Sequence, residues 1–158
     1  MLTKPMIQVR EATPQEDGLI AEHFYQMWQD NGVPTEAIQP DWRDITLQFI
    51  EQARQCLKYQ AFVAIVEGGI IGSSSCQLHA GLYPDILQPG YRQYGYVWGV
   101  FVEPSYRKQG IASQLTQQTI DYLKSIGCTR VILNASPFGK PVYDRLGFVP
   151  GNVMQLDV

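Results

Sequence analysis

The chain has 158 residues, of which 45% are hydrophobic and 17% are charged, a composition typical of a folded domain and not of a disordered segment. This length predicts a single domain over residues 1–158, large enough to bury its own core. No apolar run approaches the roughly 18 residues that a membrane-spanning helix needs. The first residues also lack the apolar stretch of a signal peptide, so we expect a cytoplasmic protein with no membrane partner.

The net charge of −3 hides an uneven distribution of charge along the chain. Residues 11–51 hold nine acidic residues and one basic residue, whereas residues 92–145 hold seven basic and three acidic residues. A protein that binds duplex DNA needs one continuous basic face, so the acidic half argues against nucleic acid as a partner. The pattern fits solvated helix faces, or a basic half that holds an anion and an acidic half that attracts a cation.

The cysteines and histidines show no spacing that would bind a metal. Cys56, Cys76 and Cys128 are an odd number without a CxxC motif, which argues against a disulfide framework and against a zinc site. His23 and His79 have no partner at metal-ligand spacing, so we expect no metal. A cysteine acyl-enzyme is also disfavoured, because no histidine stands in an evident position to activate a thiol.

The first half of the chain predicts a strand followed by two helices. Residues 6–13 form a short strand pattern, and Thr13 or Pro14 opens a helix that is expected to carry Leu19, Ile20, Phe24 and Trp28 on its inward face. Residues 41–57 predict a second helix, with a buried stripe made of Trp42, Ile45, Phe49 and Ala53.

A β-hairpin and a long loop follow the two helices. Two apolar runs, residues 61–67 and 70–78, flank the pair Gly68 and Gly69, which is a strong hairpin signal. Residues 78–93 are rich in proline, glycine and tyrosine and are long for a connection inside one domain. Such loops are often functional lids, so this one is expected to face a site.

The second half predicts a strand–helix–strand crossover. Residues 94–102 form an apolar strand, a helix runs to Ile126, and Gly127 stands where a helix C-terminal glycine belongs. Residues 129–135 predict the next strand, and a short helix spans 142–146. Residues 148–158 are expected to form a final pair of strands, whose exposed edge would suit pairing in a homodimer.

Polar residues gather between the strand and the helix of this crossover, in the stretch VEPSYRKQGIASQL (residues 102–115). The start of a helix leaves backbone N–H groups without intrahelical partners, and the helix dipole makes this end positive. Gly110 and Ala112 are small enough for a ligand to approach the backbone closely, and Arg107 and Lys108 add positive charge. The stretch therefore predicts an anion site, with phosphate as its usual occupant.

Two motifs resemble those of the GNAT superfamily of N-acetyltransferases. The sequence RKQGIA (107–112) is similar to the Arg/Gln-x-x-Gly-x-Gly/Ala signature, and VILNASPFGKPVYDRLGF (131–148) resembles the second signature of that family. The resemblance implies an α+β fold in three layers, α/β/α. Its sheet would be mixed and mostly antiparallel, with a central splayed parallel strand pair.

The same resemblance implies acetyl-CoA as cosubstrate, without a metal. Its pyrophosphate would bind the turn and helix start formed by Arg107, Lys108, Gln109, Gly110, Ile111, Ala112 and Ser113. The backbone of Phe101 and Val102 would hold the pantetheine, and Gly99 is expected to mark a bulge in that strand. Further contacts are expected from the second motif, at Asn134, Ser136 and Gly139. The last two depart from the family's usual asparagine and alanine.

The resemblance also implies that Tyr143 is the general acid, because the family commonly places a tyrosine near the sulfur of CoA. A phenol with a pKa of about 10 suits the reprotonation of a thiolate with a pKa of about 8.5. The general base stays open, because residues 94–102 contain no glutamate and Glu103 lies beyond the strand. The remaining candidates for the base are Tyr94, Tyr96, His79 and the acids of the first two helices.

The leading functional hypothesis is an N-acetyltransferase that moves an acetyl group directly to a primary amine, which the acidic half predicts to be a small cationic molecule. The first two helices and residues 78–93 would form the acceptor wall, with Trp28, Trp42, Tyr83 and Trp98 in the pocket. Two alternatives stay open: a catalytically silent CoA-binding sensor module, and an acetyltransferase of protein N-termini or lysines.

Overall fold

The structure is a computed structural model that describes residues 5–81 and 83–158. The helices and short 3-10 turns of the chain are η1 (Pro14–Glu16), α1 (Asp17–Asp30), η2 (Thr35–Ala37), α2 (Trp42–Cys56), η3 (Pro104–Tyr106), α3 (Ile111–Ser125) and α4 (Lys140–Arg145). The strands are β1 (Gln8–Glu11), β2 (Gln60–Val66), β3 (Gly69–Leu78), β4 (Tyr94–Val102) and β5 (Arg130–Ile132). These bounds confirm the order of elements that the sequence predicts as far as α4.

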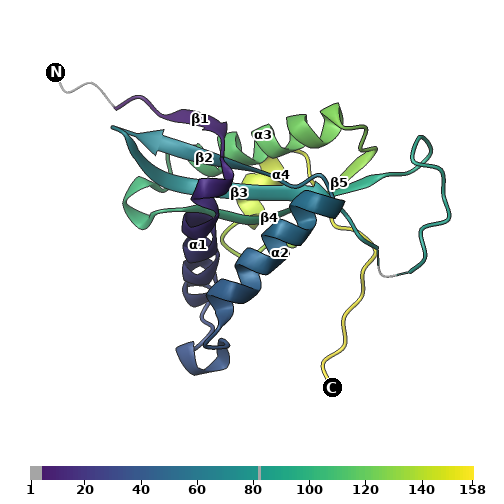
Figure 1. Ribbon diagram of the computed structural model, residues 1–158, viewed down its shortest axis with the longest axis horizontal. Helices are drawn as coiled ribbons and strands as arrows, with labels where there is room; N and C mark the ends of the chain where they lie inside the picture. The colour runs from purple at the N-terminus through teal and green to yellow at the C-terminus, as the bar shows by residue number, and fades with distance from the viewer. Residues whose placement is uncertain (1–4, 82) are drawn as a thin grey trace.

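The strands of the described residues form one sheet in the order β1-β2-β3-β4-β5, in which the β4–β5 pair is parallel and the other three pairs are antiparallel (Figure 1). The parallel register runs from Tyr94 opposite Arg130 to Tyr96 opposite Ile132 and then stops. Strand β4 continues to Val102 without β5 beside it, so the two strands splay apart toward their carboxyl ends. The predicted GNAT-like mixed α/β fold is thereby confirmed.

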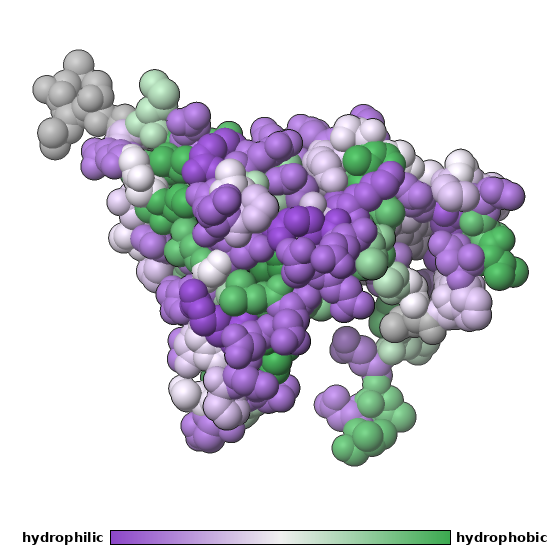
Figure 2. Space-filling view, in the orientation of Figure 1, coloured by the Kyte–Doolittle hydropathy of each residue, from purple (hydrophilic) through white to green (hydrophobic). Residues whose placement is uncertain are grey.

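The predicted pair of strands at residues 148–158 is wrong. No strand is present there, and all residues from Val149 to Val158 are exposed, with Met154 at 93%. The tail leaves the body of the protein, and Figure 2 shows hydrophobic surface on it. An apolar run becomes a strand only where a neighbouring strand accepts its backbone hydrogen bonds. Because the tail adds no strand beside β5, the parallel pair β4–β5 lies at one edge of the described sheet. Pairing of the tail in a homodimer stays a prediction.

The hairpin between β2 and β3 turns one residue earlier than the sequence predicts. Its two central residues are Glu67 and Gly68, with φ of +49° and +80°, while Gly69 already belongs to β3. Two positive φ angles are typical of the type I′ turn, whose twist matches that of the strands it joins.

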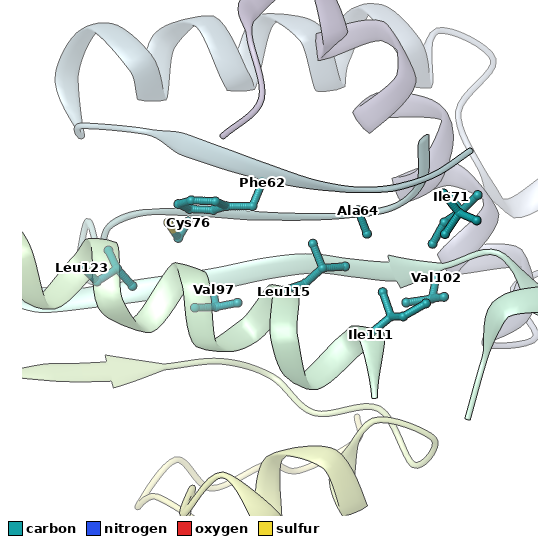
Figure 3. Packing of buried hydrophobic residues seen from close by; sticks show 10 residues of the cluster. Phe62, Ala64, Ile71, Cys76, Val97, Val102, Ile111, Leu115 and Leu123 are labelled. Carbon is teal, nitrogen blue, oxygen red and sulfur yellow. The ribbon is translucent and has the colours of Figure 1, made fainter. Parts of the chain in front are cut away.

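The helices cover both faces of the sheet, and consecutive serines of β3 show it. The hydroxyl of Ser74 donates to the Leu115 carbonyl of α3 (3.3 Å), whereas Ser73 faces His23 of α1. On the α3 side, buried side chains of β2, β3 and β4 meet Ile111 and Leu115 (Figure 3). On the other side, Ile20 of α1 and Ile50 of α2 form a second buried cluster. These contacts make the three layers that the fold class implies.

The predicted inward faces of the two first helices are only partly right. In α2 the buried residues are Thr46, Ile50 and Ala53, whereas Ile45 and Phe49 are 41% and 48% exposed. In α1, Trp28 is 45% exposed. Both helices carry apolar residues on more than one face, so helical periodicity alone does not identify the face that meets the sheet.

No helix in the described ranges combines the length and apolar character needed to cross a membrane.

We expect Gly72→Ala to destabilise the fold by about 1–3 kcal/mol, because a Cβ at this position would lie 2.8 Å from the Phe101 carbonyl oxygen and 3.3 Å from Leu115. The oxygen belongs to β4 and cannot move without shifting that strand. Urea unfolding measures the effect. Gly90→Ala is the matched control, since its Cβ would meet no atom within 4 Å, and we expect a change of less than about 0.5 kcal/mol. Equal stabilities of the two variants would contradict the close approach.

Candidate functional site

The start of α3 is an open cradle of backbone amides. Gly110 caps the helix in the left-handed region (φ +81°), and a Cβ added there would meet no atom within 4 Å. The first hydrogen bond at this end runs from the Gln114 N–H to the Gly110 carbonyl (3.1 Å). The N–H groups of Ile111, Ala112 and Ser113 precede this bond and point out of the helix. Together with the positive end of the helix dipole, they supply the N–H donors that an anion site needs.

The side chain of Arg107 connects this cradle to two other elements. Its Nε donates to the Val102 carbonyl at the end of β4 (2.8 Å), and its terminal nitrogen pairs with Asp30 at the end of α1 (2.6 Å). The guanidinium also lies over the Phe101 ring, 5.5 Å from its centroid. The carboxylate of Asp30 thus offsets part of the positive charge of Arg107. The neighbouring Lys108 is exposed and has a φ of +64°.

Strand β4 carries the predicted bulge at Gly99. Phe101 pairs with Ser73 and Trp98 pairs with Ser75, so two residues of β4, Gly99 and Val100, lie opposite a single residue of β3. Gly99 has φ +66°, a conformation that side chains rarely adopt. A bulge leaves a backbone group outside the ladder, and here it lies in the part of β4 that β5 has left.

Beyond Tyr96 and Ile132 the strands β4 and β5 separate, and we call this opening the splay. The segment that follows β5 continues the chain from the β5 side of this opening. Ser136 Oγ accepts the Gly139 N–H (3.1 Å), and a Cβ on Gly139 would lie 2.9 Å from the Tyr143 ring. The ring therefore packs directly on Gly139, which explains why this position holds the smallest residue. Burial raises the pKa of Tyr143 to about 12, so its phenol stays protonated at neutral pH. Asn134, nearer to β5, donates to the Tyr96 hydroxyl (2.9 Å).

The family model described as Acetyltransferase (GNAT) family matches residues 18–148, which include both sides of the splay. The chain belongs to the GNAT acetyltransferase family. Its sequence is 36% identical over 81 residues to a glucosamine 6-phosphate N-acetyltransferase of Trypanosoma brucei brucei, covering 51% of this chain and 52% of that protein. It is 30% identical over 91 residues to N-alpha-acetyltransferase 30 of Schizosaccharomyces pombe, covering 56% of each. The aligned segments span about half the length of these curated relatives.

Solved acetyltransferase structures share the fold over almost the whole chain. A GCN5-related N-acetyltransferase from Ralstonia eutropha JMP134 superposes with a TM-score of 0.78 at 22% identity, over 97% of this chain and 99% of that chain. A predicted acetyltransferase with acetyl-CoA from Clostridium acetobutylicum gives 0.79 at 21% identity, over 96% of each. At such identities the likeness concerns the fold alone.

In this GNAT domain, Tyr96 and His79, two of the candidates for the general base, lie together at the closed end of the splay, where β4 and β5 are still paired. Tyr96 is the last residue of β4 that pairs with β5, and the ring of His79 lies 5.8 Å from its ring. Tyr94 is engaged elsewhere, because its ring lies 4.2 Å from Arg92 and 5.2 Å from Arg130.

A cleft of about 340 Å³ lies between α1, η2 and α2. Its lining is Phe24, Tyr25, Trp28, Val33, Ala37, Ile38, Gln39, Trp42, Ile45 and Thr46. The structure thus places Trp28 and Trp42 together in one pocket. Trp98 lies next to it, with its ring 5.1 Å from Phe24, whereas Tyr83 of the long loop accepts a hydrogen bond from Arg92 (2.8 Å).

Sequence reasoning missed a buried polar layer between α1 and the sheet. His23 is 2% exposed and shares a 2.7 Å hydrogen bond with Ser73, and its ring lies 4.8 Å from Phe101. Tyr59 and Ser75 share a second one (2.8 Å), and burial raises the pKa of Tyr59. The available signal was the run of three serines inside an apolar strand, since buried hydroxyls need partners.

The neutral form of His23 should make stability depend on pH. Burial lowers the pKa of His23 from 6.5 to about 4. The stability that the neutral ring contributes to the folded state is therefore complete above pH 6.5 and is lost as the pH falls toward 4. We expect the wild type to lose about 2 kcal/mol by pH 5 from this residue. Urea unfolding of wild type and His23→Gln at pH 7 and pH 5 measures it. An equal loss in both proteins would refute the assignment.

We expect Gly110→Trp to abolish acetyl-CoA binding in calorimetry, because the side chain would enter the open space in front of the amides. Gly68→Trp is a closely matched control: its φ is +80°, its Cβ would also meet no atom within 4 Å, and it lies in the β2–β3 turn. The control should bind as the wild type does.

Arg107→Glu should abolish binding as well, since it replaces a cation beside the cradle and breaks the tie to Asp30. Unchanged affinity in both Gly110→Trp and Arg107→Glu would overturn the location of the anion site.

Proposed function

We propose that the protein is an N-acetyltransferase that moves the acetyl group of acetyl-CoA directly to a primary amine. The observation that carries the proposal is the splay of β4 from β5 beyond Tyr96, together with the open helix start at Gly110 in the segment that follows β4. Membership of the GNAT family supports the same conclusion.

The residues at the splay suit the cosubstrate. The amides of Gln109, Gly110, Ile111, Ala112 and Ser113 would hold the pyrophosphate, with Lys108 adding charge. The backbone of Phe101 and Val102 would hold the pantetheine. The Val102 carbonyl already accepts from Arg107, so part of its bonding capacity is used before the ligand binds. On the facing segment, Asn134 and Ser136 offer polar side chains and Gly139 leaves room.

Acetyl-CoA supplies an acetyl group activated as a thioester. The bulge at Gly99 would present a backbone N–H to the oxygen of that group, which is the position where negative charge develops in acyl transfer. Tyr143 would give its proton to the departing sulfur as the carbon–sulfur bond breaks. Its raised pKa keeps the proton available at neutral pH, and the same burial disfavours a free thiolate at that place.

The acceptor is proposed to be a small cationic amine. Eight of the nine acids of residues 11–51 lie between Glu16 and Glu51, the stretch that contains the helices of the cleft. Glu36 and Asp41 of this set are exposed and stand next in the chain to residues of the lining. A field of this sign attracts ammonium ions. Deprotonation of the amine is assigned to the closed end of the splay, where Tyr96 and His79 lie together.

A sensor that binds CoA without catalysis is the alternative from another class, because β4 has no glutamate to serve as base. Release of thiol from acetyl-CoA across a panel of primary amines separates the two. Binding without thiol release on any amine would favour the sensor. Acetylation of a protein N-terminus, as the name of the Schizosaccharomyces pombe relative states for that protein, is tested by adding peptides to the panel.

Tyr143→Phe should lower kcat by about 10²-fold while the affinity for acetyl-CoA stays within about twofold, because only the proton donor is removed. Tyr122→Phe is the matched control: it deletes a hydroxyl that donates to the Lys58 carbonyl (2.6 Å), away from the splay. The control should keep its kcat. If the two variants have the same kcat, Tyr143 is not the acid.

A further inference from the structure

We propose that the amine acceptor carries an apolar, preferably aromatic, group that binds in the cleft between α1 and α2, and that it carries no phosphate. This inference rests on the proposed function and adds the chemical class of the acceptor. It separates this protein from the activity named for its trypanosomal relative, whose acceptor is a sugar phosphate.

The lining of the cleft is apolar almost throughout. Among the ten lining residues only Gln39 and Thr46 have polar side chains apart from the ring groups of tyrosine and tryptophan. The Thr46 hydroxyl already donates to the Trp42 carbonyl (2.8 Å), so its one proton is used within α2. The volume of about 340 Å³ lies in the range of small-molecule sites, which is roughly 300–1,000 Å³.

The aromatic side chains of the cleft are arranged to receive a flat group. Tyr25 and Trp42 stack at 4.2 Å with an angle of 14° between their rings. The rings of Trp28 and Phe24 form a T-shaped pair with their centroids 6.0 Å apart, and Trp28 is 45% exposed. Ile45, on the other helix of the cleft, is 41% exposed. Large apolar side chains gathered around a hollow mark a binding site more often than isolated ones do. An aromatic group would remove this surface from water.

The charges around the cleft fit an ammonium ion and oppose a phosphate. None of the ten described lining residues is positively charged. The exposed acids Glu36 and Asp41 stand next in the chain to Ala37 and Trp42 of the lining. The nearby base Arg43 faces Glu22 at 4.0 Å. A phosphate needs unopposed cations or several N–H donors, whereas aromatic faces and carboxylates both attract a cationic amine.

The cleft is joined to the splay through one side chain. Phe24 lines the cleft, and its ring would lie 3.7 Å from a Cβ on Gly99, the bulge residue. The same ring meets Trp98 of β4 edge to face at 5.1 Å. An acceptor with its apolar group in the cleft would therefore reach the bulge past a single ring. We infer a short linker, such as that of an arylalkylamine.

The test compares phenethylamine, glucosamine and glucosamine 6-phosphate as acceptors, by thiol release at saturating acetyl-CoA. We expect kcat/KM for phenethylamine to exceed that for glucosamine 6-phosphate by at least about tenfold, the discrimination typical of a single apolar contact. Val33→Lys, which places a cation in the cleft, should lower kcat/KM for phenethylamine by at least about tenfold. Trp28→Ala should act in the same direction.

Val153→Lys is the matched control, since it makes the same replacement in the exposed tail and should change nothing. Unchanged affinity for acetyl-CoA in calorimetry checks that each variant folds. Preference for glucosamine 6-phosphate, or equal kcat/KM in Val33→Lys, Trp28→Ala and wild type, would overturn the inference.

The proposed function can fail separately. If no amine releases thiol, phenethylamine binding is measured by calorimetry with CoA present. Binding that Val33→Lys weakens and Val153→Lys leaves intact would keep the ligand class while rejecting the enzyme. Absence of binding would reject the ligand class as well.

Discussion

The parallel hydrogen bonds between β4 and β5 end after Tyr96 and Ile132, and the candidate site depends on that end. Beyond it, β4 continues to Val102 with no other described strand on that side, and the Val102 carbonyl there accepts a hydrogen bond from Arg107. The bulge at Gly99 turns this part of the strand, and its register with β3 on the other side holds it in place. A free strand edge that is rigid on its opposite side is what an extended ligand such as pantetheine requires.

The contacts around β4 explain why the free edge keeps its shape. Arg107 bonds the Val102 carbonyl and Asp30, so the end of the strand, the turn before α3 and the end of α1 are joined by one side chain. Each of the two ionic partners is 42% exposed, so their attraction is worth less than about 1 kcal/mol. Positioning depends more on the buried layer of His23 and Ser73 beneath Phe101, because a buried hydrogen bond leaves unpaired groups behind when it breaks.

The proposed donor side and the proposed acceptor side of the site differ in how far the sequence predicts them. The donor side lies mostly in two continuous motifs, around Gly110 and around Tyr143, and local rules of helix starts and glycine conformation identify it. The acceptor side is assembled from α1, η2 and α2. Its cleft depends on which faces of two helices are left exposed, and the periodicity of the sequence assigned Ile45 and Phe49 to the wrong face.

The sequence by itself determined the order of elements as far as α4, the glycine at the start of α3, the bulge at Gly99 and the resemblance to the family. These depend on residues close together in the chain, and glycine conformation and helix ends are local properties. The tertiary structure decided the tie between Arg107 and Asp30, the packing of the Tyr143 ring on Gly139, the pairing of His23 with Ser73, and the cleft. It also decided that residues 148–158 form no strand, because a strand needs a partner edge that no local pattern supplies.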